Sequence, residues 1–460
     1  MIIKKSTGQT TTERFLATLC ERTFLGLWSF PNPYKSDRKE LCDLLVIFEQ
    51  DVFLFFDRES RKFDRPDVHN VVTWERWKRE AVDKQIRTAE GAKRYLGTPG
   101  AQVYLDATTE TPLPIKIPSN PRIHKVVVAH GAKDACKKFS SSNVYGSLGI
   151  CYGDREPALP FPFIVHLEKR DPIHVLDSHN LEIILGELDT VYDFNAYIKA
   201  KEAAIESIDM LAYCGEEDLL AHYFLNFDEQ SKSHFIGPAD KSFNAVMIGE
   251  GEWHDFVECA PYKRKKTADR TSYLWDDIIQ RTCNNALSGT LLGNGNVFDG
   301  KSAIHEMAKE PRFSRRALAD AMFRAIENFP DTPDRLTRNV SFMPSFYQDK
   351  AYIFLQLRDP HIVDYDHDYR LKRQALLQLA CGVAKNKFPH LTKVIGIAID
   401  APKFTATNSE DFILLNCDAW PPEDATHYEQ ANKGINFFET SALRSEMRTI
   451  RNFPDIGDSG

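Results

Sequence analysis

The sequence predicts a mixed α/β protein with more than one domain. Segments whose apolar residues recur at helical spacing alternate with short, almost continuous apolar runs that are typical of buried strands. The chain has 460 residues, of which 42% are hydrophobic and 27% are charged, close to the averages of globular proteins. Because a domain commonly takes about 150 residues, we expect two to three domains.

The first 170 residues predict a sheet with flanking helices. In 11–28 the apolar residues follow one helix face, and Thr11 or Thr12 is the expected N-cap. Two apolar runs, 41–48 and 52–56, are separated only by a short polar turn, which indicates a buried hairpin. A second helix and two further strands are predicted at 74–96, 102–105 and 125–129.

Two further regions follow along the chain. Residues 180–228 are rich in strong helix formers, and a basic loop at 263–266 and further helical patterns come after them. Beyond 335 the pattern returns to strands around a helix at 369–383. The predicted strands are 341–346, 351–357, 393–399 and 412–415. We therefore expect a first α/β domain at 1–170, a mostly helical middle domain at 171–334, and a C-terminal α/β domain at 335–460.

Composition excludes several classes of protein. No run approaches the roughly 20 apolar residues of a membrane-spanning helix, and the first residues lack the apolar stretch of a signal peptide. We therefore expect a cytoplasmic protein with no membrane partner. The nine cysteines form no C-x-x-C pair, which disfavours a zinc ribbon or a disulfide framework. The formal net charge of −8 means that a nucleic acid would have to be held by a local basic surface.

Asp43 is the most informative residue of the predicted hairpin. It interrupts an otherwise apolar strand, and a carboxylate is costly to bury unless it is paired or binds a metal. Asp57 ends the second strand of the hairpin, so the two carboxylates can meet at one edge of the sheet, with Glu13 approaching from the first helix. Clustered carboxylates with a nearby cation are what metal-dependent hydrolysis of a phosphodiester requires.

This order of residues resembles the PD-(D/E)xK nuclease superfamily. An early Glu13 in helix one precedes Glu40-Leu41-Cys42-Asp43-Leu44-Leu45-Val46 and a second strand that ends in charge. The string is also similar to that of a group of uncharacterised bacterial proteins. The resemblance covers about a quarter of the chain.

The resemblance implies a restriction-endonuclease-like mixed sheet and a role in cleaving or sensing DNA or RNA. It further implies Mg²⁺ or Mn²⁺ held by Asp43 and Asp57, with Glu13 and Glu40 as supporting acids and Arg58 as the cation that stabilises the developing charge. A role in antiviral (anti-phage) defence follows by analogy with the family alone.

The second strand departs from the pattern of the superfamily. It ends Phe55-Phe56-Asp57-Arg58-Glu59, so Arg58 stands where a lysine is expected and Phe56 where an acid is expected. Thr88 likewise stands where a glutamine is expected. Arginine stays protonated and cannot act as a base. The second hypothesis is therefore an inactive nuclease fold that serves as a binding or scaffold subunit for a partner protein. The plainest alternative makes Asp43 a satisfied strand-end carboxylate, Glu13 a first-turn acid and 57–59 a solvated turn.

Two basic groups are candidates for contact with nucleic-acid phosphates. One lies on the helix after the hairpin and consists of Lys78, Arg79, Lys84 and Arg87. The other is the run Lys263, Arg264, Lys265 and Lys266. A solvated surface is the alternative for both groups.

Residues 295–302 fit the Walker A expression G-x-x-x-x-G-K-[ST], and 394–400 resembles a strand that ends in a Walker B carboxylate at Asp400. A P-loop must follow a buried strand, whereas the residues before 295 have the pattern of an amphipathic helix. A P-loop ATPase centred on Lys301 therefore ranks only third among the hypotheses. A glycine-rich turn between two helices, with Ser302 as an N-cap, is the plainer interpretation.

Core or surface positions are expected for His124, His130, His174 and His179.

Overall fold

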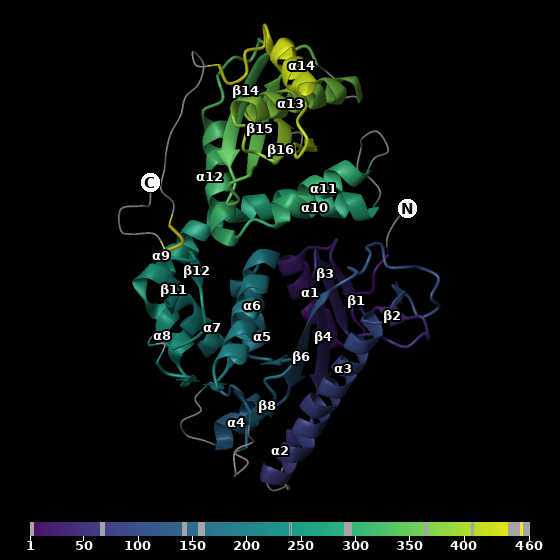
Figure 1. Ribbon diagram of the computed structural model, residues 1–460, viewed down its shortest axis with the longest axis vertical. Helices are drawn as coiled ribbons and strands as arrows, with labels where there is room; N and C mark the ends of the chain where they lie inside the picture. Colours follow the sequence, from purple (N-terminus) through teal and green to yellow (C-terminus); the bar gives the residue numbers. More distant parts are fainter. Residues whose placement is uncertain are drawn as a thin grey trace. The chain divides into compact units, whose positions relative to one another are not determined.

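The computed structural model divides the chain into two compact units, Ile2–Tyr262 and Lys263–Gly460 (Figure 1). It describes residues 4–64, 70–139, 145–154, 162–238, 240, 242–288, 297–362, 367–405, 409–439 and 451–453. Both units combine helices with sheets, which confirms the predicted α/β class. The boundaries expected near 170 and 334 fall inside these units.

The first unit is built on a five-stranded sheet of order β1-β3-β4-β6-β9. Its strands are β1 (Ser29–Pro31), β3 (Leu44–Phe48), β4 (Asp51–Glu59), β6 (Arg122–His130) and β9 (Ile173–Asp177). The first three are antiparallel neighbours, whereas β6 and β9 run parallel to β4. The predicted hairpin is thus β3–β4, and β9 extends the same sheet beyond residue 170.

Helices cover both faces of this sheet (Figure 1). On one face lie α1 (Thr11–Phe24), α5 (Asn180–Glu187) and α6 (Val191–Ser207), and the rings of Phe24, Phe53 and Phe194 pack together there. The other face carries α2 (Asn70–Lys78) and α3 (Lys84–Leu96), joined by a π-helical turn at Arg79–Asp83. Because both faces are covered, β3 and most of β4 are fully buried, as their apolar sequences predict.

Helix α1 begins one residue earlier than expected, with Thr10 rather than Thr11 or Thr12 as its N-cap. Thr10 is extended, and its side chain accepts a hydrogen bond from the N–H of Glu13. The carboxylate of Glu13 in turn accepts from the N–H of Thr10, which completes a capping box. This motif requires an acid three residues after the threonine, and of Thr10, Thr11 and Thr12 only Thr10 has one.

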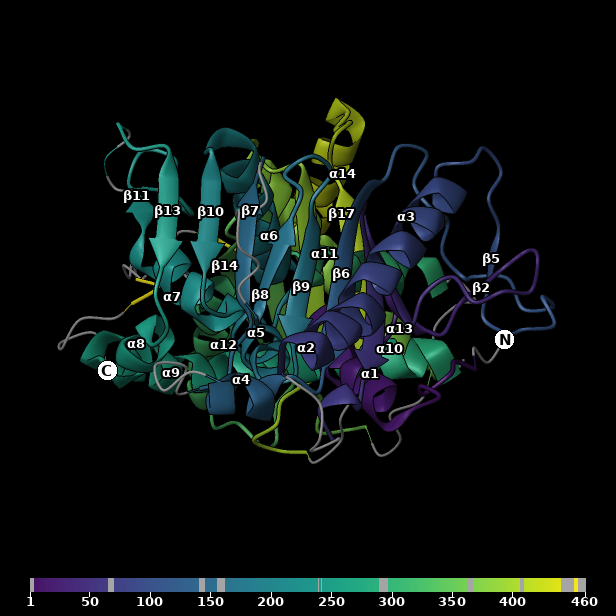
Figure 2. The same ribbon diagram turned by 90° about the horizontal axis from the view of Figure 1, so that it is seen from below.

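The rest of the first unit contains a second sheet of order β13-β10-β7-β8, whose strands β13, β10 and β7 lie side by side in Figure 2. The remaining elements are α4 (Lys133–Phe139), β7 (Gly149–Gly153), β8 (Ile164–Leu167), β10 (Met210–Tyr213), α7 (Glu216–Leu225), β13 (Ala245–Ile248), α8 (Glu252–Glu258) and the short pairs β2 (Tyr34–Lys35) with β5 (Val103–Tyr104) and β11 (Phe227–Asp228) with β12 (Ser233–His234). Strand β10 interrupts the region expected to be helical. Its residues alternate between half-buried and buried, so the period-two burial outweighs their helical propensity.

The second unit has a four-stranded sheet of order β14-β15-β16-β17. Its elements are α9 (Ala260–Ala268, which spans the boundary), α10 (Tyr273–Ser288), α11 (Val297–Ala308), α12 (Arg312–Glu327), β14 (Thr337–Pro344), β15 (Lys350–Arg358), α13 (His367–Lys387), β16 (Lys393–Asp400), β17 (Glu410–Asn416) and α14 (Pro422–Asn432). The four strands predicted after residue 335 are all present. Helix α13 packs its buried Leu377, Ala380 and Cys381 against the apolar strands of the sheet.

Among the described residues, no helix is both long enough and apolar enough to cross a membrane.

Candidate functional site

The candidate site lies at one edge of the first sheet, where its parallel strands end. Strands β4, β6 and β9 run in the same direction, and the register aligns Arg58, Ala129 and Asp177 across them. The antiparallel strand β3 begins at this same edge, which places Asp43 there. Ligands of α/β sheets commonly bind at the carboxyl ends of parallel strands, because polar side chains and loops meet there.

Three of the predicted acids gather around one asparagine at this edge. The side-chain nitrogen of Asn32 donates to Glu13 Oε2 over 3.0 Å and to Glu40 Oε1 over 2.8 Å. The backbone N–H of Asn32 donates to the carbonyl of Asp43 over 2.9 Å. Glu13 therefore has two roles, since it also completes the capping box of α1.

Asp43 carries the most strongly perturbed carboxyl of this group. Burial raises its pKa from an ordinary value of 3.8 to about 8, against the effect of a hydrogen bond from the N–H of Asp57. The charges of Glu40, Glu13 and Asp57 raise its pKa further. That hydrogen bond to Asp43 Oδ2 measures 2.5 Å. Burial and the neighbouring acids together therefore favour the protonated form of Asp43.

Asp57 takes a different partner from the one expected. Its Oδ1 lies 2.6 Å from Nε2 of His130, at the end of the neighbouring strand β6. Its Oδ2 is buried and has no hydrogen-bond partner among the described residues. Asp57 thus contacts Asp43 through its backbone, while its carboxylate is directed to a histidine.

Arg58 is directed away from Asp57, because successive side chains of a strand point to opposite faces. Its guanidinium lies 3.5 Å from Glu80 in the π-helical turn, and Lys62 pairs with the same carboxylate over 3.0 Å. The guanidinium is half exposed, so this ion pair contributes little stability.

The two basic groups differ in how they are presented. On α2, the π-helical turn and α3, Arg79, Lys84 and Arg87 are exposed and Lys78 is partly exposed. The run 263–266 lies within helix α9 and is not the loop that we expected. Lys265 is buried there and pairs with Asp269 over 2.6 Å, which removes it from contact with a phosphate.

The Walker-like string lies largely in helix α11, which begins at Val297; Gly295 and Asn296 lie outside the described residues. Lys301 and Ser302 are therefore inside the helix, and Ser302 is not its N-cap. A P-loop instead keeps the residues before its Gly-Lys-Ser in an open loop that cradles phosphate. Asp400 is paired with the guanidinium of Arg373 over 2.7 Å.

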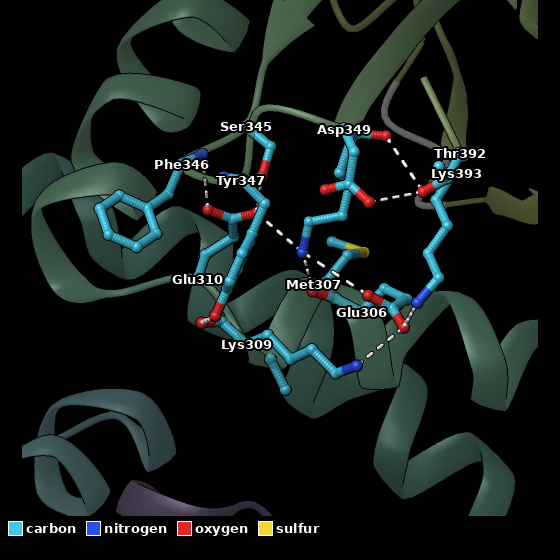
Figure 3. Close-up of polar contacts among 12 residues, drawn as sticks. Glu306, Met307, Lys309, Glu310, Ser345, Phe346, Tyr347, Asp349, Thr392 and Lys393 are labelled. Atoms are coloured by element: carbon cyan, nitrogen blue, oxygen red, sulfur yellow. Dashed lines mark hydrogen bonds and ion pairs between the residues drawn. The ribbon is translucent and has the colours of Figure 1, made fainter. Parts of the chain in front are cut away.

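A buried ionic cluster, which the sequence did not indicate, fixes α11 to the sheet of the second unit (Figure 3). Lys309 and Lys393 lie 2.9 and 2.8 Å from the carboxylate of Glu306. Lys350, at the start of β15, lies 3.1 Å from Glu310 just beyond the helix. All these charges are paired, so the cluster serves as a structural anchor.

Sequence reasoning also missed two residues at the candidate edge, His130 and Ser178. Nδ1 of His130 lies 2.8 Å from Oγ of Ser178, which directly follows β9. Both stand at the ends of parallel strands, and that position is the signal that could have identified them. Their distance from Asp57 in the sequence hid the contact.

Comparisons with models of protein families, with curated proteins and with solved structures found no match. Among the described residues, no three His, Cys, Asp or Glu side chains are grouped so that they could hold a metal ion by themselves.

Proposed function

We propose that the first unit is a nuclease-like domain that binds Mg²⁺ or Mn²⁺ at Asp43 and acts on DNA or RNA. The observation that carries this proposal is the environment of Asp43, a carboxyl surrounded by the charges of three other acids. A divalent cation would relieve their repulsion. The order of helix α1, three antiparallel strands, helices α2 and α3, and parallel strand β6 supports the proposal, because it agrees with the PD-(D/E)xK resemblance.

The residues present fit such an ion in their chemistry. Mg²⁺ prefers oxygen ligands and commonly takes only one or two carboxylates from a protein, keeping several of its waters. Asp43 would hold it, with Glu40 beside it as the second acid, and the orphaned Oδ2 of Asp57 lies on the adjoining strand. When bound, the ion would polarise a phosphoryl oxygen and lower the pKa of a water.

Nucleic acid would be held by the exposed basic residues of the helix beside the sheet. Arg79, Lys84 and Arg87 supply local positive charge on a chain whose formal net charge is −8. We extend the proposal to action in the cytoplasm, which is the expectation from the apolar pattern of the sequence. We extend it also to defence against phage, which rests on the family resemblance alone.

A second candidate function is an inactive nuclease fold that binds a partner protein or nucleic acid. The contacts of β4 favour it: Asp57 Oδ1 bonds to His130 and Arg58 pairs with Glu80. Both side chains that the superfamily would use on this strand then have other partners. The Walker-like string gains no such support, because Lys301 lies within α11.

The test is cleavage of plasmid and single-stranded DNA and RNA with Mg²⁺ or Mn²⁺. Wild-type protein is expected to cut, and Asp43→Asn to lose at least about 100-fold in rate because the ion loses its ligand. Asp37→Asn is the matched control, since Asp37 is an exposed acid of the preceding turn. Cutting that Asp43→Asn leaves intact would reject this site. Binding without cutting by either protein would favour the second candidate, and ATP hydrolysis lost on Lys301→Ala would favour a P-loop.

A further inference from the structure

Asp57, His130 and Ser178 form a continuous hydrogen-bonded chain across the ends of three parallel strands. Asp57 Oδ1 lies 2.6 Å from Nε2 of His130, and Nδ1 of His130 lies 2.8 Å from Oγ of Ser178. Exposure rises along the chain, from 1% for the side chain of Asp57 to 9% for that of His130, and Ser178 is exposed. A buried acid, a shielded imidazole and an accessible hydroxyl thus stand in sequence.

The local backbone fixes each member of this chain. Ser178 occupies the sharp turn between β9 and α5, where the carboxylate of Asp177 accepts hydrogen bonds from the N–H groups of His179 and Asn180 over 2.7 and 3.0 Å. The residue after His130 is Gly131, with φ of 98°, and a Cβ there would overlap the carbonyl oxygen of Ser60. Only glycine fits at this position, so the end of β6 is held close to the end of β4.

We propose that Ser178 is a nucleophile for hydrolysis of a carboxylic ester, with His130 as its general base and Asp57 as the positioning residue. Three groups that define serine hydrolases occur together: a nucleophile, a base within hydrogen-bond reach of it, and a buried carboxylate that orients the base. This hydrogen-bonded series is recognised by its geometry, because its three residues lie far apart in the sequence.

The reaction balances with water as the only co-reactant. Ser178 Oγ forms a bond to the acyl carbon while its proton passes to Nδ1 of His130, and Asp57 keeps Nε2 protonated. The bond from the acyl carbon to the alcohol oxygen then breaks, and the alcohol leaves with the proton from Nδ1. Water attacks the acyl group, gives one proton to Nδ1, and releases the acid as Ser178 Oγ recovers that proton. One ester and one water give one acid and one alcohol.

A lysine ammonium lies beside the residue that follows Ser178. Nζ of Lys133, at the start of α4, lies 3.3 Å from Nδ1 of His179, the residue after Ser178. An ammonium in this position would stabilise negative charge on the acyl oxygen.

This activity goes beyond the proposed nuclease function and does not depend on it. It needs no metal ion, and its nucleophile and base are not in the group formed by Glu13, Glu40 and Asp43. Asp57 is the residue through which the two would interact, since its backbone bonds to Asp43 and its carboxylate to His130.

The test is covalent labelling of the full-length protein with a fluorophosphonate in EDTA, followed by peptide mass spectrometry. Label is expected on Ser178, together with hydrolysis of p-nitrophenyl butyrate, and both should vanish in Ser178→Ala and in His130→Gln. Asp57→Asn should slow labelling at least about tenfold, because the imidazole then loses its preferred tautomer. Ser231→Ala, which alters an exposed serine hydrogen-bonded to Asp228, is the matched control and should label normally.

Unlabelled Ser178 in folded wild-type protein would overturn the proposal without reference to any variant. Labelling of Ser178 at an unchanged rate in folded His130→Gln would overturn it too, because Ser178 would then react without the general base that the proposal gives it. Metal-dependent cleavage of nucleic acid is measured separately, so failure of either activity can be told from failure of the other.

Discussion

At the scale of single residues, Asp43 makes stability depend on pH in an unusual direction. Most carboxylates of folded proteins have lowered pKa values, whereas that of Asp43 is raised to about 8. Between pH values of about 4 and 8 the folded protein therefore retains a proton that the unfolded chain has released. The stabilisation that the protonated carboxyl of Asp43 contributes to the folded state is present in full below about pH 4 and is lost as the pH rises to 8.

Asp43→Asn should remove this dependence. The unfolding free energy of the variant minus that of wild type is expected to rise by about 1–3 kcal/mol from pH 5 to pH 8, measured by urea denaturation. Taking the difference between the two proteins cancels other buried acids such as Glu217, whose pKa is also raised to about 8. A difference that is constant over this pH range would show that Asp43 is not protonated in the folded state.

Residue-level prediction from the sequence succeeded for local anomalies and failed for distant contacts. Asp43 could be identified because a carboxylate in an apolar run is conspicuous without any knowledge of the fold. The chain from Asp57 to His130 to Ser178 could not, because it depends on β4, β6 and β9 being neighbours. Lys265 was expected at a basic surface, but it is buried beside Asp269, which also pairs with the distant Arg316 on α12.

At the scale of elements, buried ion pairs join helices to their neighbours. The ammonium of Lys201 on α6 lies 2.7 Å from both carboxylate oxygens of Glu216, the first residue of α7. Both side chains are almost wholly buried. Removing one partner leaves an uncompensated charge, which is far more costly than losing an exposed pair.

Lys201→Met is therefore expected to lower the unfolding free energy by about 3–5 kcal/mol. Lys232→Met is the matched control: Lys232 pairs with Glu229 on the surface, and its loss should change stability by no more than about 0.5 kcal/mol. Chemical denaturation of the three proteins gives both values. Equal effects of the two substitutions would refute the distinction.

Element types could be predicted more reliably than their connections. The hairpin β3–β4 and the strands after residue 335 follow from apolar runs, because those runs are local. Strand β10 was missed because its neighbouring residues favour helices, and its pairing with β7 and β13 is not encoded nearby. The order of strands in the first sheet likewise became visible only in the structure.

At the scale of the whole molecule, the chain contains two compact units with separate ionic anchors. Lys201 and Glu216 belong to Ile2–Tyr262, whereas Lys350 and Glu310 belong to Lys263–Gly460. Calorimetry is expected to resolve two transitions. Lys201→Met should lower the midpoint of one and Lys350→Met that of the other, because each leaves a buried carboxylate unpaired in its own unit. A single transition shifted equally by both variants would contradict two independently stabilised units.

The central claim is that a divalent cation binds at the acidic edge of the first sheet. The most direct measurement is an anomalous difference map from crystals of the protein soaked in Mn²⁺. We expect a peak about 2.1 Å from a carboxylate oxygen of Asp43, absent in Asp43→Asn. Peaks that lie only elsewhere, or no peak at saturating Mn²⁺, would contradict the claim.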